Sequence, residues 1–177
     1  MFQPKTILTI LSAAALLTTS AQSWALATDR EQPVYIEADY ADIDQLNHVT
    51  VYRGNVKIRQ GSIGIWGDVV TIYTDQNNDL IKAFSDAKAG SLARFKQMPD
   101  DKPDEVWGEG ERLEYWAAEN LVKIFRRGKL WQGKDVFTSH RILYDTAKEV
   151  LVGGDQSTAG TGQAKERVRM TIQPKKQ

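Results

Sequence analysis

Apolar and polar residues alternate along most of this chain, and such alternation is typical of β-strands. Val34, Ile36 and Ala38 alternate with Tyr35 and Glu37, and the same period of two returns in the stretches 56–59, 63–72 and 89–96. Alternation places one set of side chains on each face of a sheet. Because several stretches are apolar on one face only, the sequence predicts antiparallel sheets with a dry side and a wet side.

One short pattern occurs four times. A small residue and a polar residue are followed by an apolar-alternating stretch, a polar turn and a second apolar stretch. The four pairs are Ala38-Asp39, Gly67-Asp68, Gly110-Glu111 and Ser139-His140. A repeat every 30 to 40 residues or so indicates one strand-turn-strand unit stacked on copies of itself. Such a stack presents a long surface, which is typical of proteins that bind something extended.

The segment 111–125 fits two secondary structures. Leu113, Leu121 and Ile124 fall at helical spacing, and taken alone the segment matches an amphipathic helix. The repeat favours a strand that ends at Tyr115, a turn through 117–120 and a second strand over 121–125. We therefore predict two strands, because a helix in one copy would interrupt the stack.

Residues 1–25 are predicted to be a cleavable secretory signal peptide. Lys5 precedes a mostly apolar stretch, and Ser23-Trp24-Ala25 or Ala25-Leu26-Ala27 offers small residues to a signal peptidase. The apolar stretch of about 11 residues is shorter than the roughly 20 that a transmembrane helix needs. The prediction is one domain over 26–173, followed by a basic, disordered tail at 174–177.

Composition narrows the classes of function. The chain contains no cysteine, so an exported domain of this sequence would rely on burial and sheet hydrogen bonds rather than on disulfides. Its 23 basic and 23 acidic residues balance, which does not suggest a nucleic-acid partner.

The residues that enzymes need are scarce. His48 and His140 are the only histidines and lie on different repeats, so we expect no metal site and no cofactor. Asp39, Asp68 and Glu111 recur at one position of the repeat, which favours a turn-capping or sheet-surface role over a catalytic pair. We expect a binding surface rather than an enzyme.

Apolar and aromatic side chains are abundant. Five tryptophans, six tyrosines and five phenylalanines occur, mostly in the alternating stretches. The default interpretation is that they fill the core of a sandwich. If the two apolar faces are held apart, they instead form a slot for alkyl chains.

Four stretches in order along the chain carry a family resemblance: 32–39, 53–61, 67–70 and 93–98. Together with the signal peptide they resemble the LptA (OstA-like) family of periplasmic lipopolysaccharide-transport proteins, and the resemblance covers the whole mature chain. The chain departs from the family pattern at Gly128-Lys129-Leu130, in place of a second Gly-Asn-Val, and at Ser139-His140, in place of an Ala-Asp pair.

The resemblance implies an all-β fold: an open, twisted β-jelly roll of two antiparallel sheets in a V, with the lipid A acyl chains of lipopolysaccharide between them. It also implies a periplasmic bridge that meets an inner-membrane LptC-type protein at the N-terminal edge and an outer-membrane LptD-type translocon at the C-terminal edge. Two alternatives stay open: a structural β scaffold, or a carbohydrate-binding or carbohydrate-processing jelly roll without lipid cargo.

Alternation and the resemblance together predict which residues bind lipid and which form edges. The inward-facing, lipid-binding residues are expected to be Val34, Ile36, Ala38, Phe95, Leu113 and Tyr115. For Leu113 and Tyr115 the alternative is a packed core. Edge strands near 33–40 and 166–173 are expected to pair head to tail with another copy or to dock the membrane partners. The residues expected on these edges are Tyr35, Glu37, Asp39, Arg167, Val168, Arg169, Met170 and Ile172.

Overall fold

The computed structural model describes residues 29, 31–99, 102–160 and 167–174. The described strands are β1 (Val34–Glu37), β2 (Tyr40–Asp44), β3 (Val49–Gln60), β4 (Ile63–Thr74), β5 (Leu80–Asp86), β6 (Ala93–Gln97), β7 (Val106–Gly110), β8 (Arg112–Trp116), β9 (Leu121–Gln132), β10 (Asp135–Asp145), β11 (Val150–Gly153) and β12 (Arg169–Thr171). A 3-10 turn, η1 (Gln156–Thr158), follows β11. The predicted signal peptide, Glu166 and residues 175–177 of the predicted tail lie outside the described residues.

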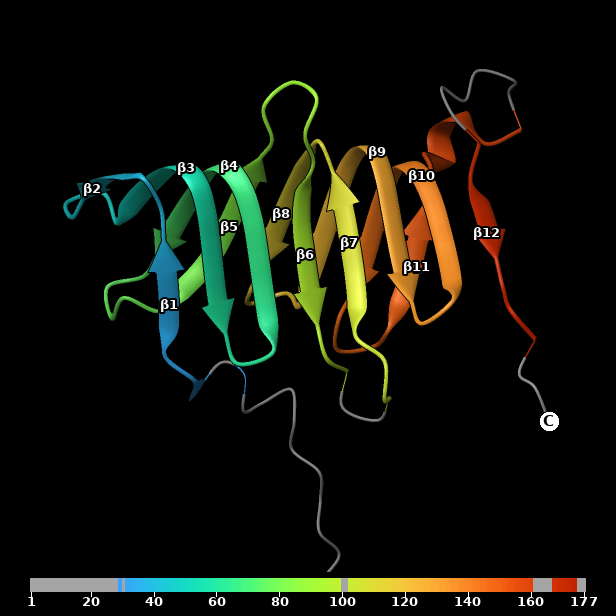
Figure 1. Ribbon diagram of the computed structural model, residues 1–177, viewed down its shortest axis with the longest axis horizontal. Helices are drawn as coiled ribbons and strands as arrows, with labels where there is room; N and C mark the ends of the chain where they lie inside the picture. The colour runs from blue at the N-terminus through green and yellow to red at the C-terminus, as the bar shows by residue number, and fades with distance from the viewer. Residues whose placement is uncertain (1–28, 30, 100–101, 161–166, 175–177) are drawn as a thin grey trace, which may run out of the picture.

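The strands form two layers that share four long members. One half of each of β3, β4, β9 and β10 lies in a front sheet with β1, β6, β7 and β12. The other half lies in a back sheet with β2, β5, β8 and β11. Every pairing between described strands is antiparallel. The prediction of an all-β fold with two antiparallel sheets is confirmed (Figure 1).

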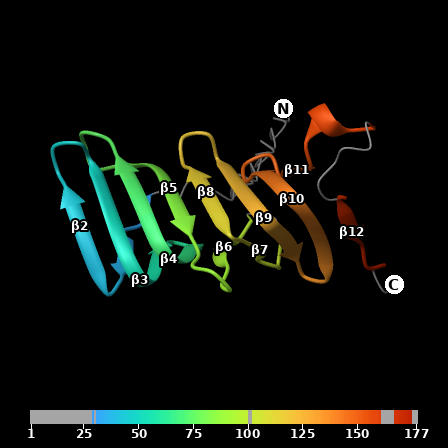
Figure 2. The ribbon, with the colours of Figure 1, turned by 90° about the horizontal axis from the view of Figure 1, so that it is seen from above.

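The sheets meet along one edge, which we call the spine. It includes the points where the described chain crosses from one sheet to the other at residues 38–39, 54–55, 67–68, 87–92, 110–111, 126–128 and 139–140. Seen from above, the strands follow one another in a row from β2 at one end to β12 at the other (Figure 2). All four small-polar pairs of the sequence repeat lie on the spine. The repeat is therefore the recurrent crossing between sheets.

A β-bulge shows how a long strand bends at the spine. The register between β3 and β4 shifts between Arg53 and Val56, and the two residues in the gap, Gly54 and Asn55, have φ angles of 77° and 48°. Left-handed backbone is readily available to glycine and tolerated by asparagine. The extra residues turn β3 out of one sheet and into the other.

The carboxylates that recur in the repeat hold the crossings together. Asp39 accepts a hydrogen bond from Asn55 Nδ2 at 2.8 Å. Asp68 Oδ2 accepts from the Lys88 backbone N–H at 2.8 Å and from Ser91 Oγ at 2.7 Å. Asp68 therefore caps the loop after β5, and Asp39 holds β3 through a side-chain contact, in agreement with the predicted turn-capping or sheet-surface roles.

Glu111 joins the crossing at 110–111 to the crossing at 126–128. Its two carboxylate oxygens accept from Arg126 Nε at 2.8 Å and Arg127 Nε at 2.9 Å. The pKa of Glu111 is lowered, and the hydrogen bond from Arg126 is the largest cause. Glu111 too caps a crossing, as the repeat predicted.

The inner faces of both sheets carry unbroken cross-strand rows. One residue from each of eight strands forms the central row of the front sheet: Ile36, Ile58, Ile65, Phe95, Gly108, Leu130, Phe137 and Met170. A facing row of the back sheet is Ile43, Thr50, Ile72, Ala83, Tyr115, Val122, Tyr144 and Leu151. The members on the middle strands are mostly buried and form the core, Ile36 and Leu151 pack against it half-buried, and Ile43 and Met170 at the two ends are exposed.

The structure resolves the ambiguous segment in favour of strands. β8 ends at Trp116, a turn follows, and β9 begins at Leu121, so the two-strand prediction is confirmed. The two edge strands are shorter than the predicted stretches 33–40 and 166–173. β1 ends at Glu37, because Ala38 and Asp39 belong to the spine, and β12 is limited to Arg169–Thr171.

The interpretation of the tryptophans as core residues is wrong for Trp66, Trp107 and Trp131. These three lie on the outer face of the front sheet, where adjacent rings stack with centroids 5.7 and 6.0 Å apart. Trp116 lies on the outer face of the back sheet beside Phe84. Neighbouring lysines cover the rings; Lys129 Nζ lies 4.6 Å from the Trp131 ring centroid. The indoles stiffen the outer faces, and aliphatic residues fill most of the interior.

Candidate functional site

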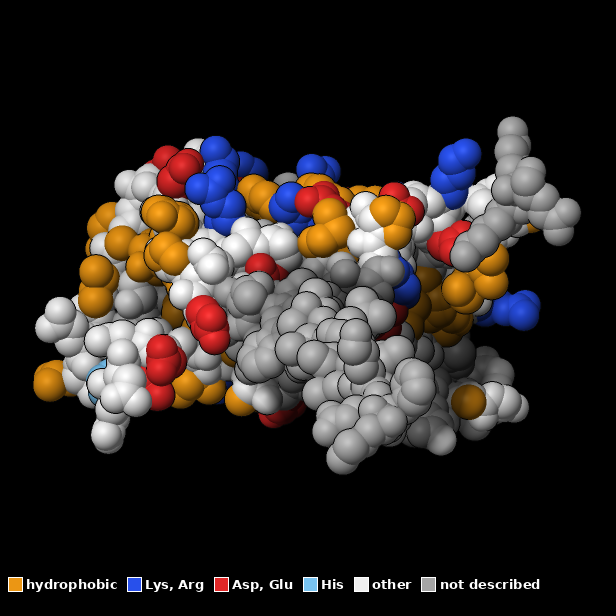
Figure 3. Space-filling model, turned by 90° about the horizontal axis from the view of Figure 1, so that it is seen from below, with side chains coloured by type: hydrophobic (Ala, Val, Ile, Leu, Met, Phe, Trp, Pro, Cys, Tyr) orange, Lys and Arg blue, Asp and Glu red, His pale blue; other side chains and the backbone are white. Residues whose placement is uncertain are grey.

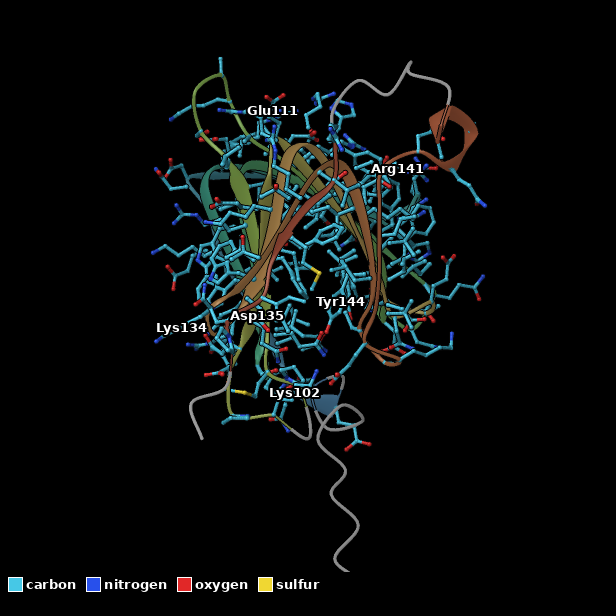
Figure 4. All side chains as sticks on the ribbon, turned by 90° about the vertical axis from the view of Figure 1, so that its right-hand side faces the viewer. Lys102, Glu111, Lys134, Asp135, Arg141 and Tyr144 are labelled. Atoms are coloured by element: carbon cyan, nitrogen blue, oxygen red, sulfur yellow. The ribbon has the colours of Figure 1, made fainter. Side chains whose placement is uncertain are left out.

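The interior between the two sheets is the candidate site. Viewed along the long axis, side chains fill the space between the sheets, with Glu111 near the edge where they meet and Lys102 at the opposite edge (Figure 4). We call that opposite edge the distal edge; its residues include Gln60, Lys102 and Glu149. The interior is apolar and both of its long edges are polar, which is the arrangement that an amphiphile with apolar chains requires.

Three of the predicted lipid-binding residues meet at the centre of the interior. Phe95 of the front sheet stacks on Tyr115 of the back sheet with ring centroids 6.3 Å apart, and Leu113 lies beside them. They are 1%, 4% and 3% exposed. The cavity that they line measures about 10 Å³, enough for no more than one water molecule. In this conformation the three residues form a closed core.

The other three predicted lipid-binding residues lie at the N-terminal end of the fold. Ile36 is half-buried and packs against the core, whereas Val34 is 42% exposed. Ala38 is exposed and lies on the spine rather than in β1. The structure therefore brings Ile36 into the same row as Phe95 and leaves Ala38 outside it.

Large apolar side chains are exposed at both ends of the fold. They are Val34, Tyr35, Tyr40 and Ile43 at the N-terminal end and Val150, Val152, Val168, Met170 and Ile172 at the C-terminal end. Figure 3 shows hydrophobic side chains gathered at the left end, over the region of β1 and β2. Among the described strands, β1 and β2 pair only with β3, and β11 and β12 pair only with β10. Each end thus presents unpaired strand edges beside exposed apolar side chains.

The predicted edge residues divide between these ends. Tyr35 and Glu37 lie on the outer face of β1, where Arg59 stacks on the Tyr35 ring and Lys57 Nζ lies 3.5 Å from Glu37. Asp39 is on the spine instead. At the other end Met170 pairs with Phe137 in the inner row and Arg169 faces outward; Arg167, Val168 and Ile172 flank β12.

The sequence did not reveal how the distal edge is built. Lys102, in the loop between β6 and β7, forms an ion pair with Glu149, in the turn between β10 and β11, and so links the front sheet to the back sheet. Gln60 Nε2 donates to the Gln32 carbonyl and Gln132 Nε2 to the Asp104 carbonyl, each at 3.1 Å. The available signal was the Gln-Gly pair that ends both β3 and β9, at 60–61 and 132–133.

Few titratable groups reach the interior. Tyr144 lies between the sheets and is 5% exposed (Figure 4). Burial, followed by the nearby carboxylates of Glu149 and Asp145, raises the pKa of Tyr144 to about 12. Within the described ranges, no group of three or more His, Asp or Glu side chains is arranged to hold a metal ion. No helix in the described part of the chain is both long enough and apolar enough to cross a membrane.

Comparisons with known proteins agree with one another. The family described as LptA/(LptD N-terminal domain) LPS transport protein matches residues 35–150. The lipopolysaccharide export system protein LptH of Pseudomonas aeruginosa is 33% identical over 89% of this chain and 88% of its own length. LptA of Escherichia coli K12 is 30% identical over 79% of this chain and 74% of its own length. The crystal structure of LptH from Pseudomonas aeruginosa superposes with a TM-score of 0.72 at 31% identity, covering 83% of this chain and 99% of that one.

The raised pKa of Tyr144 predicts a loss of stability in alkali. Between pH 10 and 12 the unfolded chain loses the phenolic proton while the folded chain keeps it, so the free energy of unfolding falls as the pH rises through this window. The Tyr144→Phe variant lacks this contribution. From pH 9 to 11 its free energy of unfolding in urea should fall by about 1 kcal/mol less than that of the wild type. Equal losses in the two proteins would contradict the assignment.

Proposed function

We propose a mechanism from the premise that this chain belongs to the LptA/LptD N-terminal domain family and is a lipopolysaccharide-transport protein. Its role is to shield the lipid A acyl chains in the apolar interior while the phosphorylated sugars stay in water. The observation that carries this proposal is the pair of unbroken inner rows, which extend through eight strands in each sheet. We place the protein in the periplasm, because the family operates between two membranes.

The energetics explain why such a carrier is required. Each methylene group moved out of water contributes about 0.8 kcal/mol, so a 12-carbon acyl chain left in water costs roughly 9 kcal/mol. A row of apolar side chains that continues from strand to strand lets the acyl chain advance with little change in burial. The carrier then needs no chemistry of its own, and the driving energy is supplied elsewhere.

Loading requires the two sheets to separate. A cavity the size of one water molecule beside Phe95 and Tyr115 has no room for an acyl chain. The spine fixes one edge of the sheets, and the distal edge is crossed by side-chain contacts such as the ion pair of Lys102 and Glu149. We infer that the sheets open from the distal edge, with the spine as the hinge.

Catalysis is not part of the proposed function. The relatives are named as transport proteins, and the carboxylates that could have formed a catalytic pair have structural partners at the spine. The carbohydrate-processing alternative needs two acidic residues that face one groove. Asp39, Asp68 and Glu111 lie along the spine, outside the interior, and do not provide that arrangement.

The exposed ends suggest how the carrier is extended. Unpaired strand edges accept another chain by strand addition. We propose that the β12 end of one molecule meets the β1 end of the next, which continues the inner rows from Met170 to Ile36 of the following copy. The same surfaces would receive the LptC-type protein at the N-terminal end and the LptD-type translocon at the C-terminal end. Because the two ends differ, the contact is head to tail and does not close on itself.

The lipid path is tested by site-specific photocrosslinking in cells. A photoreactive residue at Ile36 or Phe95 should capture lipopolysaccharide, because both side chains belong to the inner row. The neighbouring positions Glu37 and Lys96 face outward and serve as matched controls that should capture little. Equal capture from the inner and outer positions would contradict the proposed path.

The head-to-tail contact is tested by truncation. A chain that ends after Lys165 lacks β12 and should stay monomeric at concentrations where the full mature chain forms oligomers, as measured by sedimentation velocity. A chain that ends after Gln173 loses only the tail and is the matched control, which should still assemble. Oligomers of the shorter chain, mapped by cross-linking to other surfaces, would rule out the arrangement.

A further inference from the structure

One buried polar atom in the interior has no visible partner. Gln97, the last residue of β6, is 3% exposed, and its Oε1 accepts no hydrogen bond from any residue that the structure describes. Leaving a buried acceptor unsatisfied is unfavourable. Sites that bind a ligand tolerate this arrangement, because the ligand supplies the missing group.

Two other glutamines at the distal edge of the front sheet, Gln60 and Gln132, have hydrogen-bond partners for their side chains. At the distal edge of the front sheet Gln60 pairs with Ile63 of β4, and Gln97 pairs with Val106, which in turn pairs with Gln132; the β4–β6 pairing between them ends one residue earlier, at Gly64 and Lys96. The side chains of Gln60 and Gln132 donate to backbone carbonyls and fasten the adjoining segments. Gln97 lies between them, at the middle of the fold, with its oxygen unused.

Gln97 lies at the depth where the linkage between the acyl chains and the headgroup of a bound amphiphile would be. It follows Phe95 by two residues on the same inner face of β6, about 7 Å nearer to the distal edge. With acyl chains beside Phe95 and the polar headgroup outside the distal edge, Gln97 is level with the atoms that join chain to headgroup. Those atoms are the first polar groups that a loaded lipid brings into the interior.

We propose that Gln97 Oε1 accepts a hydrogen bond from an N–H or O–H group at the acyl linkage of the lipid. The inference rests on the proposed lipid-carrier function and adds a basis for selectivity. Lipid A carries amide-linked and 3-hydroxylated acyl chains, so its linkage offers donors. The ester linkages of ordinary diacyl glycerophospholipids offer acceptors only. An unpaired buried acceptor therefore favours lipid A and disfavours a glycerophospholipid, which would leave Oε1 unsatisfied.

The test uses two lipids with one headgroup. Short-chain sphingomyelin has an amide N–H and a hydroxyl at its linkage, whereas short-chain phosphatidylcholine has neither. Displacement of a hydrophobic fluorescent probe gives the affinity of the mature protein for each, and for purified lipopolysaccharide. The wild type should bind sphingomyelin about three- to tenfold more tightly than phosphatidylcholine, the range of one net hydrogen bond. A 3-deoxy sphingomyelin, which keeps only the N–H, identifies which donor is used.

The decisive variant is Gln97→Met, which preserves the volume and removes the amide. Its preference for sphingomyelin should fall to about one, because the acceptor Oε1 is gone. Gln132→Met is the matched control: it breaks a bond to the Asp104 carbonyl, so it should lower the midpoint of thermal unfolding and leave the lipid preference unchanged.

Each contrary result has one meaning. An unchanged preference in Gln97→Met overturns the role of Gln97. The absence of any preference in the wild type does the same. A wild-type protein that binds no lipopolysaccharide overturns the carrier function itself, which separates the two failures.

Discussion

The bend of four long strands at the spine is the constraint on which the rest of the structure depends. A strand that leaves one sheet and enters another interrupts its ladder of hydrogen bonds, and the freed backbone and side-chain groups need new partners. Here Asp39, Asp68 and Glu111 supply them, with Asn55, Ser91 and the paired arginines 126 and 127. Because the seven described crossings of the spine lie on the same edge, the sheets share one hinge, and their apolar faces have to meet on one side of it.

Continuity of the inner rows links the fold to transport. Each strand adds one residue to a row, and all but Gly108 contribute a side chain, so the pairing runs from Ile36 to Met170 at the two ends, where exposed apolar neighbours lie. A closed interior protects these side chains from water when no lipid is present. In the proposed open state the rows form a path rather than a pocket, once Phe95 and Tyr115, which stack across the interior in the closed state, have moved apart.

The sequence revealed the parts of this design that are periodic. Alternation identified the inner faces of β3, β4 and β6, and the recurring small-polar pair located four crossings of the spine. The sequence could not show whether the faces that carry the tryptophans are covered, because an aromatic residue in an alternating strand has the same pattern in both cases. Trp66, Trp107 and Trp131 lie on the outer face, where they stack on one another and where Lys96 and Lys129 lie over Trp107 and Trp131. Gln97 and the Lys102–Glu149 ion pair escaped prediction for a different reason. The ion pair joins segments far apart in the chain, and Gln97 stands out only because folding buries its side-chain oxygen without a partner; no local pattern in the sequence records either property.

Opening of the sheets about the spine can be measured as a distance. Spin labels at Lys134, in the turn of the front sheet, and Lys148, in the turn of the back sheet, lie at the distal edge, where separation is greatest. A second pair at Ala89 and His140, whose side chains make none of the contacts that hold the crossings, reports on the spine. Double electron-electron resonance should show the distal distance lengthening when lipopolysaccharide is added while the spine distance stays constant. Saturating lipopolysaccharide that leaves the distal distance unchanged would contradict the account.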